Sequence, residues 1–258
     1  PATRRDDEEK IQEEEAAAKA PPGTVGETLE VATHYSSRPN GGIVERESSK
    51  IIAMRKFNNW VKASLAEMYC GGGAGATVLE LCGGKGGDLG KWEKRKAKHV
   101  VLADVALESV KQSTERYHDL LESAKRRAME SRTPIQMFTA TFICADCFRV
   151  DLGRHLPSGL CFDIVSCQFS LHYSFESEAT ARGLLANASS RLRPGGFFIG
   201  TIPNADVLYK KLMSAEDLEF GNSVFKIRFD NKKEFPKFGS RYTFTLVDAV
   251  GGVPEYLV

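Results

Sequence analysis

Residues 78–89 read Val-Leu-Glu-Leu-Cys-Gly-Gly-Lys-Gly-Gly-Asp-Leu, an apolar run that ends in a glycine-rich turn and leads into a helical pattern. A second apolar run, Val100 to Ala103, ends in Asp104. Strand, glycine turn, helix, strand and terminal acid in this order are typical of a βαβ unit that binds a nucleoside. Glycines let the backbone lie close to a ligand, and a carboxylate can accept hydrogen bonds from both ribose hydroxyls.

The residues around the turn narrow the choice of nucleoside cofactor. A dinucleotide fingerprint counted from Gly84 would need a glycine where Leu89 stands, and a phosphate-binding P-loop would need Ser or Thr directly after Gly84-Lys85. Glu80, two residues before the turn, would repel a phosphate but could pair with the cationic amino group of an amino-acid moiety. The combination favours S-adenosylmethionine over NAD or ATP. A tight turn without any ligand is the alternative, which Asp104 disfavours.

Length and charge set limits on the domain and its partners. At 258 residues the chain can bury one large core or two small ones, and its net charge is +1. Residues 1–20 hold seven acidic and four basic side chains, and we expect residues 1–30 to form a charged flexible tail before a domain at 31–258. The remaining basic side chains favour an anionic partner, but too weakly to indicate DNA. No apolar stretch reaches membrane-spanning length, so no membrane partner is expected.

The chain has six cysteines, two of which are spaced as a possible metal or redox motif. Cys144 and Cys147 form this C-x-x-C pair. A structural zinc site usually has a second close pair, and Cys161 and Cys167 are too far apart to supply it. Cys161 and Cys167 flank or lie within apolar runs. We therefore interpret the cysteines as small buried thiols and expect no metal site.

From about residue 48 the pattern alternates between helix and strand. The predicted helices are 48–69, 87–97, 106–130 and 176–192, and the predicted strands are 77–82, 99–104, 137–145, 162–168 and 196–202. Such alternation predicts an α/β fold with a doubly wound, mostly parallel sheet and helices on both faces. Ligands bind such sheets at the carboxyl ends of the strands.

Polar residues and glycines follow the predicted strands at these carboxyl ends. The set comprises Cys82-Gly83-Gly84, Asp104, Asp146, Gln168 to Tyr173 and Pro203-Asn204. For Asp146 alone, a helix cap is an equal alternative. As a member of the set, its carboxylate could accept a hydrogen bond from an adenine amino group.

Four stretches of the chain resemble the eukaryotic mRNA cap guanine-N7 methyltransferases, which are class I S-adenosylmethionine-dependent enzymes with a Rossmann-like sheet. They are Phe57 to Lys62 (FNNWVK), Gly84 to Trp92 (GKGGDLGKW), Ser166 to Tyr173 (SCQFSLHY) and Arg193 to Thr201 (RPGGFFIGT), and Val31 to Tyr35 and Arg116-Tyr117 also fit. The match runs from about Val31 to Val258. Family members continue beyond the segment that resembles Val253 to Val258, so we expect the C-terminal part of the domain to be truncated here.

The resemblance implies transfer of a methyl group from S-adenosylmethionine to N7 of the guanine that caps an RNA 5′ end, leaving S-adenosylhomocysteine. By position, the implied cofactor residues are Lys62, Cys82, Gly83, Gly84, Asp104, Asp146, Gln168 and Tyr173, to which the reasoning above adds Glu80. The implied cap residues are Asn58, Asn59, Lys85, Lys91, Arg116, Phe169, His172, Tyr173, Pro203 and Glu255. A nuclear location is also implied, with capped RNA and other capping or transcription factors as partners.

The side chains suit these implied roles. Lys85, Lys91 and Arg116 can neutralise a triphosphate bridge, although a solvated surface charge is the simpler interpretation of Lys91 alone. Phe169 offers a ring on which a base can stack, with core packing as an equal alternative. Glu255 can accept from guanine N1–H and the N2 amine, a donor pair that adenine lacks.

His172 invites interpretation as a catalytic base, but the chemistry does not require one. Guanine N7 carries a lone pair and no proton at neutral pH, so nothing has to be removed before it attacks. We therefore predict direct in-line displacement on the sulfonium methyl, driven by proximity, orientation and electrostatics. No residue acts as acid or base in this hypothesis, and His172, Tyr173 and Phe169 position the guanine.

The family usually has Gly-Cys-Gly where this chain has Cys82-Gly83-Gly84. We expect the Cys82 side chain to narrow the pocket for the methionine part of the cofactor. Two alternative functions stay open: a small-molecule methyltransferase, since a fold does not fix a substrate, and a cap- or RNA-binding module with impaired catalysis. A dehydrogenase is disfavoured because the dinucleotide fingerprint fails.

Overall fold

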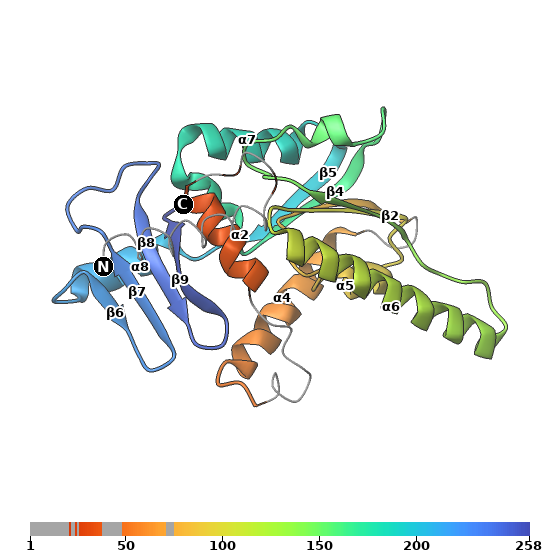
Figure 1. Ribbon diagram of the computed structural model, residues 1–258, viewed down its shortest axis with the longest axis horizontal. Coiled ribbons are helices and arrows are strands. Elements are labelled where there is room, and N and C mark those ends of the chain that lie inside the picture. Colours follow the sequence, from red (N-terminus) through yellow and green to blue (C-terminus); the bar gives the residue numbers. More distant parts are fainter. Residues whose placement is uncertain (1–20, 22–23, 25, 38–47, 71–74) are drawn as a thin grey trace, which may run out of the picture.

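The computed structural model describes residues 21, 24, 26–37, 48–70 and 75–258. The strands form two sheets, a parallel one of order β3-β2-β1-β4-β5 and an antiparallel one of order β6-β7-β8-β9. Figure 1 shows the antiparallel sheet at the left of the molecule. The strands are β1 (Thr77–Leu81), β2 (His99–Asp104), β3 (Thr139–Cys144), β4 (Phe162–Gln168), β5 (Leu192–Thr201), β6 (Glu219–Gly221), β7 (Phe225–Phe229), β8 (Arg241–Leu246) and β9 (Val250–Tyr256). The helices are α2 (Glu27–Ser37), α4 (Ile52–Tyr69), α5 (Leu89–Lys94), α6 (Leu107–Ser131), α7 (Glu178–Ser189), α8 (Ala205–Ser214) and the 3₁₀ segments η1 (Leu152–His155) and η2 (Leu171–Glu176).

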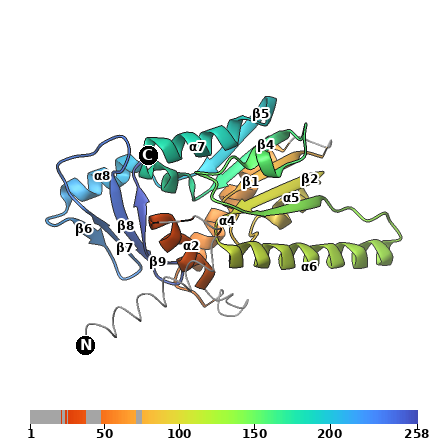
Figure 2. The same ribbon diagram turned by 45° about the horizontal axis from the view of Figure 1, so that its top comes forward.

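The parallel sheet is covered by helices on both faces, which confirms the predicted doubly wound fold (Figures 1 and 2). On one face, Leu79 and Val101 pack with Leu184 of α7. On the other face, Val78 and Val100 pack with residues of α4 and α5, including the buried Trp92. Every residue of β1 is buried. Burial on both faces explains why the strands read as continuous apolar runs rather than alternating ones.

Several element boundaries differ from the predicted ones. The first long helix begins at Ile52 instead of residue 48, and α2 begins at Glu27, before the predicted domain start at residue 31. Residues 1–20 of the predicted tail lie outside the described residues. Strand β5 begins at Leu192 instead of residue 196, because Leu192 pairs with Phe162 before a register shift carries the ladder through the Pro-Gly-Gly segment.

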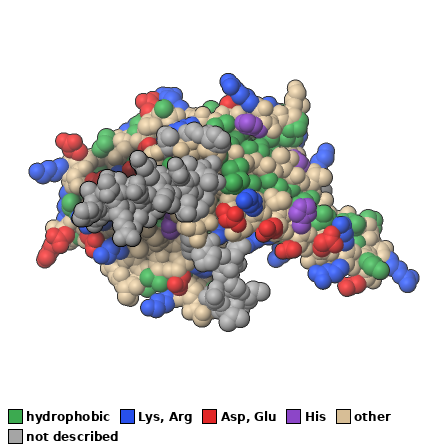
Figure 3. Space-filling view, viewed as in Figure 1, with side chains coloured by type: hydrophobic (Ala, Val, Ile, Leu, Met, Phe, Trp, Pro, Cys, Tyr) green, Lys and Arg blue, Asp and Glu red, His purple; other side chains and the backbone are tan. Residues whose placement is uncertain are grey.

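The antiparallel sheet and α8 are not among the predicted elements. They have a core of their own, in which Leu212 of α8 packs with Ile227, Phe229 and Tyr242. Strand β9 lies against η2 and α2, which attaches this second sheet to the carboxyl edge of the parallel sheet. On the far side, α6 projects from the body with acidic and basic side chains mixed along it (Figure 3). No helix in the described part of the chain combines the length and apolar character needed to cross a bilayer.

Gly183 of α7 tests how tightly this helix packs. A Cβ at Gly183 would lie 1.9 Å from the carbonyl oxygen of Phe148, whereas a Cβ at Gly90 of α5 would meet nothing within 4 Å. We therefore expect Gly183→Ala to lower the free energy of unfolding by about 1–3 kcal/mol. Gly90→Ala should raise it by about 0.5–1 kcal/mol because alanine favours a helix. Urea unfolding of both variants measures the difference, and equal effects would contradict the packing.

Candidate active site

The turn after β1 is held against the end of β2 by two close contacts. A Cβ at Gly83 would lie 2.5 Å from Cγ of Leu102, so only glycine fits. The next residue, Gly84, has φ of +53° and donates its backbone N–H to Oδ2 of Asp104 at 2.8 Å. The backbone N–H of Ala106 donates to Oδ1 at 2.9 Å. The glycine turn and the terminal acid, predicted as parts of one βαβ unit, are therefore joined by a direct hydrogen bond.

Asp104 is poised to accept further hydrogen bonds. Burial raises its pKa, and the two backbone N–H donors oppose this shift. Each carboxylate oxygen has a lone pair left after accepting one of these bonds. A pair of adjacent hydroxyls, such as those of a ribose, suits this arrangement.

A cavity of about 60 Å³ lies at the carboxyl ends of β1, β2 and β3. Four predicted site residues line it: Cys82, Asp104, Asp146 and Tyr173. The other lining residues are Glu27, Thr28, Val31 and Tyr35 of α2, together with Val105, Cys147, Phe148, Ser170, Glu176, Pro254 and Tyr256. Ligand pockets for drug-sized molecules measure roughly 300–1,000 Å³. The cavity in this structure is smaller than such pockets, and α2 lines one side of it.

Helix α2 forms the outer wall of this cavity through polar contacts. The hydroxyl of Tyr35 lies 3.2 Å from that of Tyr173, and Arg149 donates to the hydroxyl of Thr28 at 2.6 Å. Glu27 forms an ion pair with Arg241 of β8 at 2.9 Å and also contacts the hydroxyl of Tyr256. Sequence reasoning missed Glu27 and Thr28 because they lie in the predicted tail. The sequence signal that could have found them is the adjacent stretch from Val31 to Tyr35, which fits the family resemblance. No site residue was predicted in that stretch.

Cys82 lines the cavity and has a strained backbone conformation. Its φ of +53° is in the left-handed region, which costs an L-residue about 1–2 kcal/mol. The neighbouring Cys82 thiol and burial raise the pKa of Cys147 well above its usual range. Cys147 therefore stays a protonated, poorly nucleophilic thiol. These side chains occupy space at the cavity wall.

Three predicted residues belong to a buried charge cluster next to the turn after β1. Lys62 of α4 and Lys91 of α5 both pair with Asp88, at 2.8 Å and 2.6 Å. Burial opposes ionisation of Asp88, but the two lysines outweigh it and lower its pKa. Glu80 accepts a hydrogen bond from Nε1 of Trp92 at 3.1 Å and is buried. This differs from the predicted role of Glu80, because its carboxylate points into the protein and does not line the cavity.

The cluster carries excess positive charge near neutral pH. Burial and the nearby charge of Asp88 raise the pKa of Glu80 from 4.5 to about 8. Glu80 is therefore mostly protonated at pH 7, leaving the carboxylate of Asp88 against two lysines. Such an excess favours an incoming anion, for example a carboxylate or a phosphate.

A second polar cluster joins the parallel sheet to β9. Glu255 of β9 is buried and accepts from the hydroxyl of Tyr242 at 2.7 Å and from that of Tyr173 at 3.4 Å. His172 lies 3.5 Å away through its Nε2, and neither of its ring nitrogens has a hydrogen-bond partner among the described residues. Burial raises the pKa of both Tyr173 and Tyr242, so both stay phenols that can donate. The structure thus brings together three predicted cap residues.

The remaining predicted residues surround these clusters. Asn59 accepts from Nζ of Lys91 at 3.1 Å, and Asn58 is half-buried on the same helix. A Cβ at Gly87 would lie 3.9 Å from Nη1 of Arg116, so Arg116 lies over the turn that contains Lys85. Three others are placed as follows: Phe169 is partly exposed after β4, Pro203 is half-buried after β5, and Gln168 contacts Ser166 and Thr201 instead of lining the cavity.

Asp146 performs two roles in the loop after β3. Its Oδ1 caps the backbone N–H of Phe148 at 2.8 Å, and its Oδ2 pairs with Arg149 at 3.1 Å. Asp146 thus caps a turn and not a helix, so the helix-cap alternative is wrong, and the same carboxylate also lines the cavity.

Comparison with known proteins relates this site to one family. Residues 23–258 match the family model of the mRNA (guanine-N(7))-methyltransferase domain. The mRNA cap guanine-N(7) methyltransferase 1 of Oryza sativa subsp. japonica is 45% identical over 234 residues, which cover 88% of this chain and 61% of the relative. The mRNA cap guanine-N(7) methyltransferase of Caenorhabditis elegans is 42% identical over 238 residues, covering 88% and 60%. The chain thus spans about three-fifths of the length of these curated relatives.

Solved structures are also similar at low identity. The CcbJ methyltransferase from Streptomyces caelestis has a TM-score of 0.48 at 13% identity, with 77% of this chain and 76% of that chain covered.

The raised pKa of Glu80 predicts how stability depends on pH. The unfolded chain loses the proton near pH 4.5, whereas the folded chain retains it until about pH 8. Glu80 therefore lowers the free energy of unfolding as pH rises from about 5 to 8. Glu80→Gln retains an acceptor for Trp92 and removes this loss. The free energy of unfolding of the variant, relative to that of the wild type, should therefore increase between pH 5 and pH 8. Urea unfolding at both pH values measures the gain.

The matched control for this experiment is Glu178→Gln on α7, where the side chain is largely exposed. This control should follow the wild type at both pH values. A Glu80→Gln difference that stays constant with pH would contradict the assignment.

Proposed function

Because this chain belongs to the mRNA (guanine-N(7))-methyltransferase family, we propose that it transfers a methyl group from S-adenosylmethionine to N7 of the guanine that caps an RNA 5′ end. The observation that carries the proposal is the position of Tyr173. This residue lines the cavity at the carboxyl edge, and its hydroxyl also reaches Glu255. One side chain is therefore shared between a nucleoside cavity and a polar cluster suited to guanine.

The cofactor would occupy the cavity at the carboxyl edge of the parallel sheet. Asp104 would accept from the ribose hydroxyls, and Asp146 from the adenine amine. Lys62, from the cluster with excess positive charge, would pair with the methionine carboxylate. Gly83 and Gly84 would let the backbone lie against the methionine part.

The guanine would bind at Glu255. Its oxygens can accept from N1–H and from the N2 amine, in addition to the hydroxyl of Tyr242 that already donates. Lys85, Lys91 and Arg116 would contact the triphosphate bridge, and Phe169 and Pro203 would lie against the base or its ribose. The orphan ring nitrogens of His172 offer one more hydrogen bond to the base.

The reaction needs positioning but no proton transfer. The lone pair of guanine N7 forms the new N–C bond while the S–C bond breaks, and the bonding electrons stay on sulfur as S-adenosylhomocysteine forms. Positive charge moves from sulfur to the guanine ring. The buried carboxylate of Glu255 would stabilise that charge on the base, so electrostatics favour the transition state.

The proposal extends to partners and location. We infer a nuclear protein that meets capped RNA together with other capping or transcription factors, since caps form on new transcripts. The competing hypothesis is methyl transfer to a small molecule. The basic side chains around the turn favour a substrate with a triphosphate instead.

The first test uses purified chain, labelled S-adenosylmethionine and RNA with an unmethylated guanosine cap, with triphosphate-ended RNA as control. We expect label on the capped RNA alone, recovered as 7-methylguanosine. Label on neither RNA, with capped RNA still bound, would favour the binding module with impaired catalysis. Label on a small molecule in preference to capped RNA would overturn the proposal.

Substitution of His172 separates positioning from proton transfer. We expect His172→Ala to lower kcat/KM for capped RNA by roughly 10-fold, the size of one lost hydrogen bond at the base. The pH–rate profile should keep its shape, because no proton leaves N7. A limb that is present in the wild-type profile and absent from the variant would show that His172 acts as a base.

Substitution of Cys82 tests the narrowed pocket. Cys82→Gly removes the side chain from the cavity wall and relieves the left-handed strain. We expect tighter binding of S-adenosylhomocysteine, measured by calorimetry, with Cys161→Ala outside the cavity as control. Unchanged or weaker binding would show that the thiol does not limit cofactor access.

A further inference from the structure

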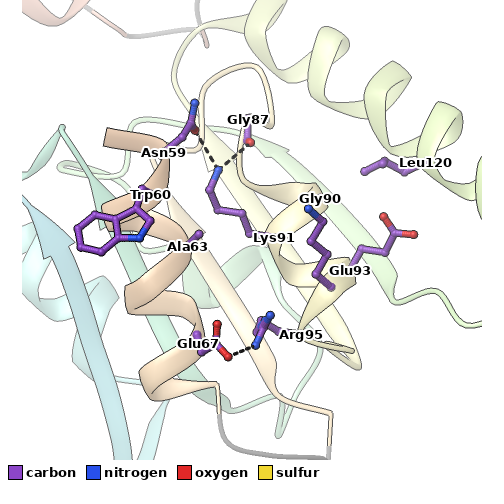
Figure 4. Close-up of a pocket in the computed structure, with 11 residues that line it drawn as sticks. Asn59, Trp60, Ala63, Glu67, Gly87, Gly90, Lys91, Glu93, Arg95 and Leu120 are labelled. Carbon is purple, nitrogen blue, oxygen red and sulfur yellow. Dashed lines mark hydrogen bonds and ion pairs between the residues drawn. The ribbon is translucent and has the colours of Figure 1, made fainter. Parts of the chain in front are cut away.

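A second and larger hollow lies outside the cofactor cavity. It has a volume of about 520 Å³ and runs between α4 and α5, with Leu120 of α6 at one side (Figure 4). We call it the α4–α5 groove. Its lining residues are Asn59, Trp60, Ala63, Glu67, Gly87, Gly90, Lys91, Glu93, Lys94, Arg95 and Leu120. The clusters described above use only Asn59 and Lys91 of this set.

The groove has an exposed aromatic wall. Trp60 is 64% exposed, and the ring of Phe57 one helical turn away is 61% exposed. Their centroids are 5.9 Å apart with an interplanar angle of 31°. Large aromatic side chains that stay exposed in this way mark surfaces that bind a partner. A flat indole face suits a stacked base.

Charge in the groove favours an anion. Its acids are both engaged, since Glu67 pairs with Arg95 at 2.8 Å and Glu93 contacts Arg127 of α6. The groove has more basic than acidic side chains, because the exposed Lys94 also lines it. A phosphodiester chain would thus find basic side chains next to an aromatic face.

The groove is continuous with the proposed cap site. Figure 4 shows Lys91 reaching between Asn59 and the carbonyl of Gly87. Lys91 also pairs with Asp88 in the buried cluster, so it contacts both regions. An RNA whose triphosphate bridge lies over Lys91 and Arg116 would continue into the groove with its next nucleotides.

We propose that the α4–α5 groove binds the first transcribed nucleotides of the capped RNA. Trp60 stacks on a base, and Lys94 and Arg95 contact the phosphates that follow. This inference rests on the proposed cap methyltransferase function and names a part of the substrate beyond the cap. Stacking tolerates any base and phosphate contacts read no sequence, so binding is independent of RNA sequence.

The experiment compares two acceptors that share a guanosine triphosphate. One is a ten-nucleotide RNA with an unmethylated guanosine cap, and the other is GTP, which has no following nucleotide. Methyl transfer to each gives kcat and KM, and anisotropy of labelled RNA gives Kd. Trp60 fluorescence adds a direct readout, because the only other tryptophan, Trp92, is buried.

We expect Trp60→Ala to raise KM and Kd for the capped RNA by about tenfold, with kcat and the GTP reaction unchanged. Trp60→Phe should recover most of the affinity because a phenyl ring still stacks. Lys94→Ala should lower the slope of log Kd against log salt by about 0.7, the value for one lost single-strand phosphate contact. In the wild type, RNA should quench Trp60 and GTP should not.

Matched controls come from α8, outside the groove. Tyr209→Ala removes an exposed aromatic ring that contacts Phe235, as Trp60 contacts Phe57. Lys210→Ala removes an exposed lysine. Both controls should leave KM for capped RNA and its salt dependence as in the wild type.

Three outcomes would overturn the inference. Trp60→Ala could leave RNA affinity unchanged, or it could impair GTP and RNA equally, which would indicate an effect on the cap site. RNA could also fail to quench Trp60, which would favour a protein partner for the groove. Failure of the proposed function looks different: the wild type would methylate neither acceptor, while quenching by RNA would still report on the groove.

Discussion

The contact between the turn after β1 and the end of β2 is the constraint on which the site depends. Gly83 fits against Leu102 only without a Cβ, and Gly84 donates to Asp104. Because β1 and β2 are neighbours in the parallel sheet, this contact fixes the terminal acid beside the turn. The preceding residue, Cys82, has a positive φ, and its side chain lines the cavity. The position of the terminal acid beside the turn thus follows from one close approach.

The shared carboxylate of Asp88 extends this site toward α4 and α5. Two lysines from different helices pair with it, so a single buried acid holds Lys62 on the cofactor side and Lys91 on the groove side. Protonation of Glu80 leaves the cluster short of negative charge. An anion that binds on either side of the cluster can supply the missing negative charge. In the proposed complex, the same charge excess would face the cofactor carboxylate at one end and the RNA phosphates at the other.

The sequence predicted the parts of the molecule that depend on local pattern. Alternating runs and turn residues predicted the parallel sheet, and they also predicted that the glycine turn and Asp104 lie at the carboxyl ends of its strands. The contact of Glu80 with Trp92 was not among the predictions, because no spacing rule shows that the indole N–H of Trp92 donates to this carboxylate. Contacts over long sequence separations were not predictable in this way. Thr28 reaches Arg149 across 121 residues, and the pairing of Tyr173 with Glu255 spans 82.

Glu255 was expected from family resemblance alone, since an isolated acid near a chain end has no pattern of its own. Its environment explains the role: β9 pairs with β8, which places Tyr242 beside it, and β9 also lies against η2. The antiparallel sheet thus places one buried carboxylate beside Tyr173 and His172. This placement depends on tertiary structure, because the strands that provide it are short and their core is separate from the main one.

Tyr173 connects the cavity at the carboxyl edge with the cluster around Glu255. Its hydroxyl lies near both Tyr35 of α2 and Glu255 of β9, and burial keeps it protonated. A phenol has one proton, so it can donate to only one of these two oxygens at a time. Because Tyr173 also lines the cavity, the hydrogen bonding of Glu255 depends on which neighbour of this hydroxyl receives the proton.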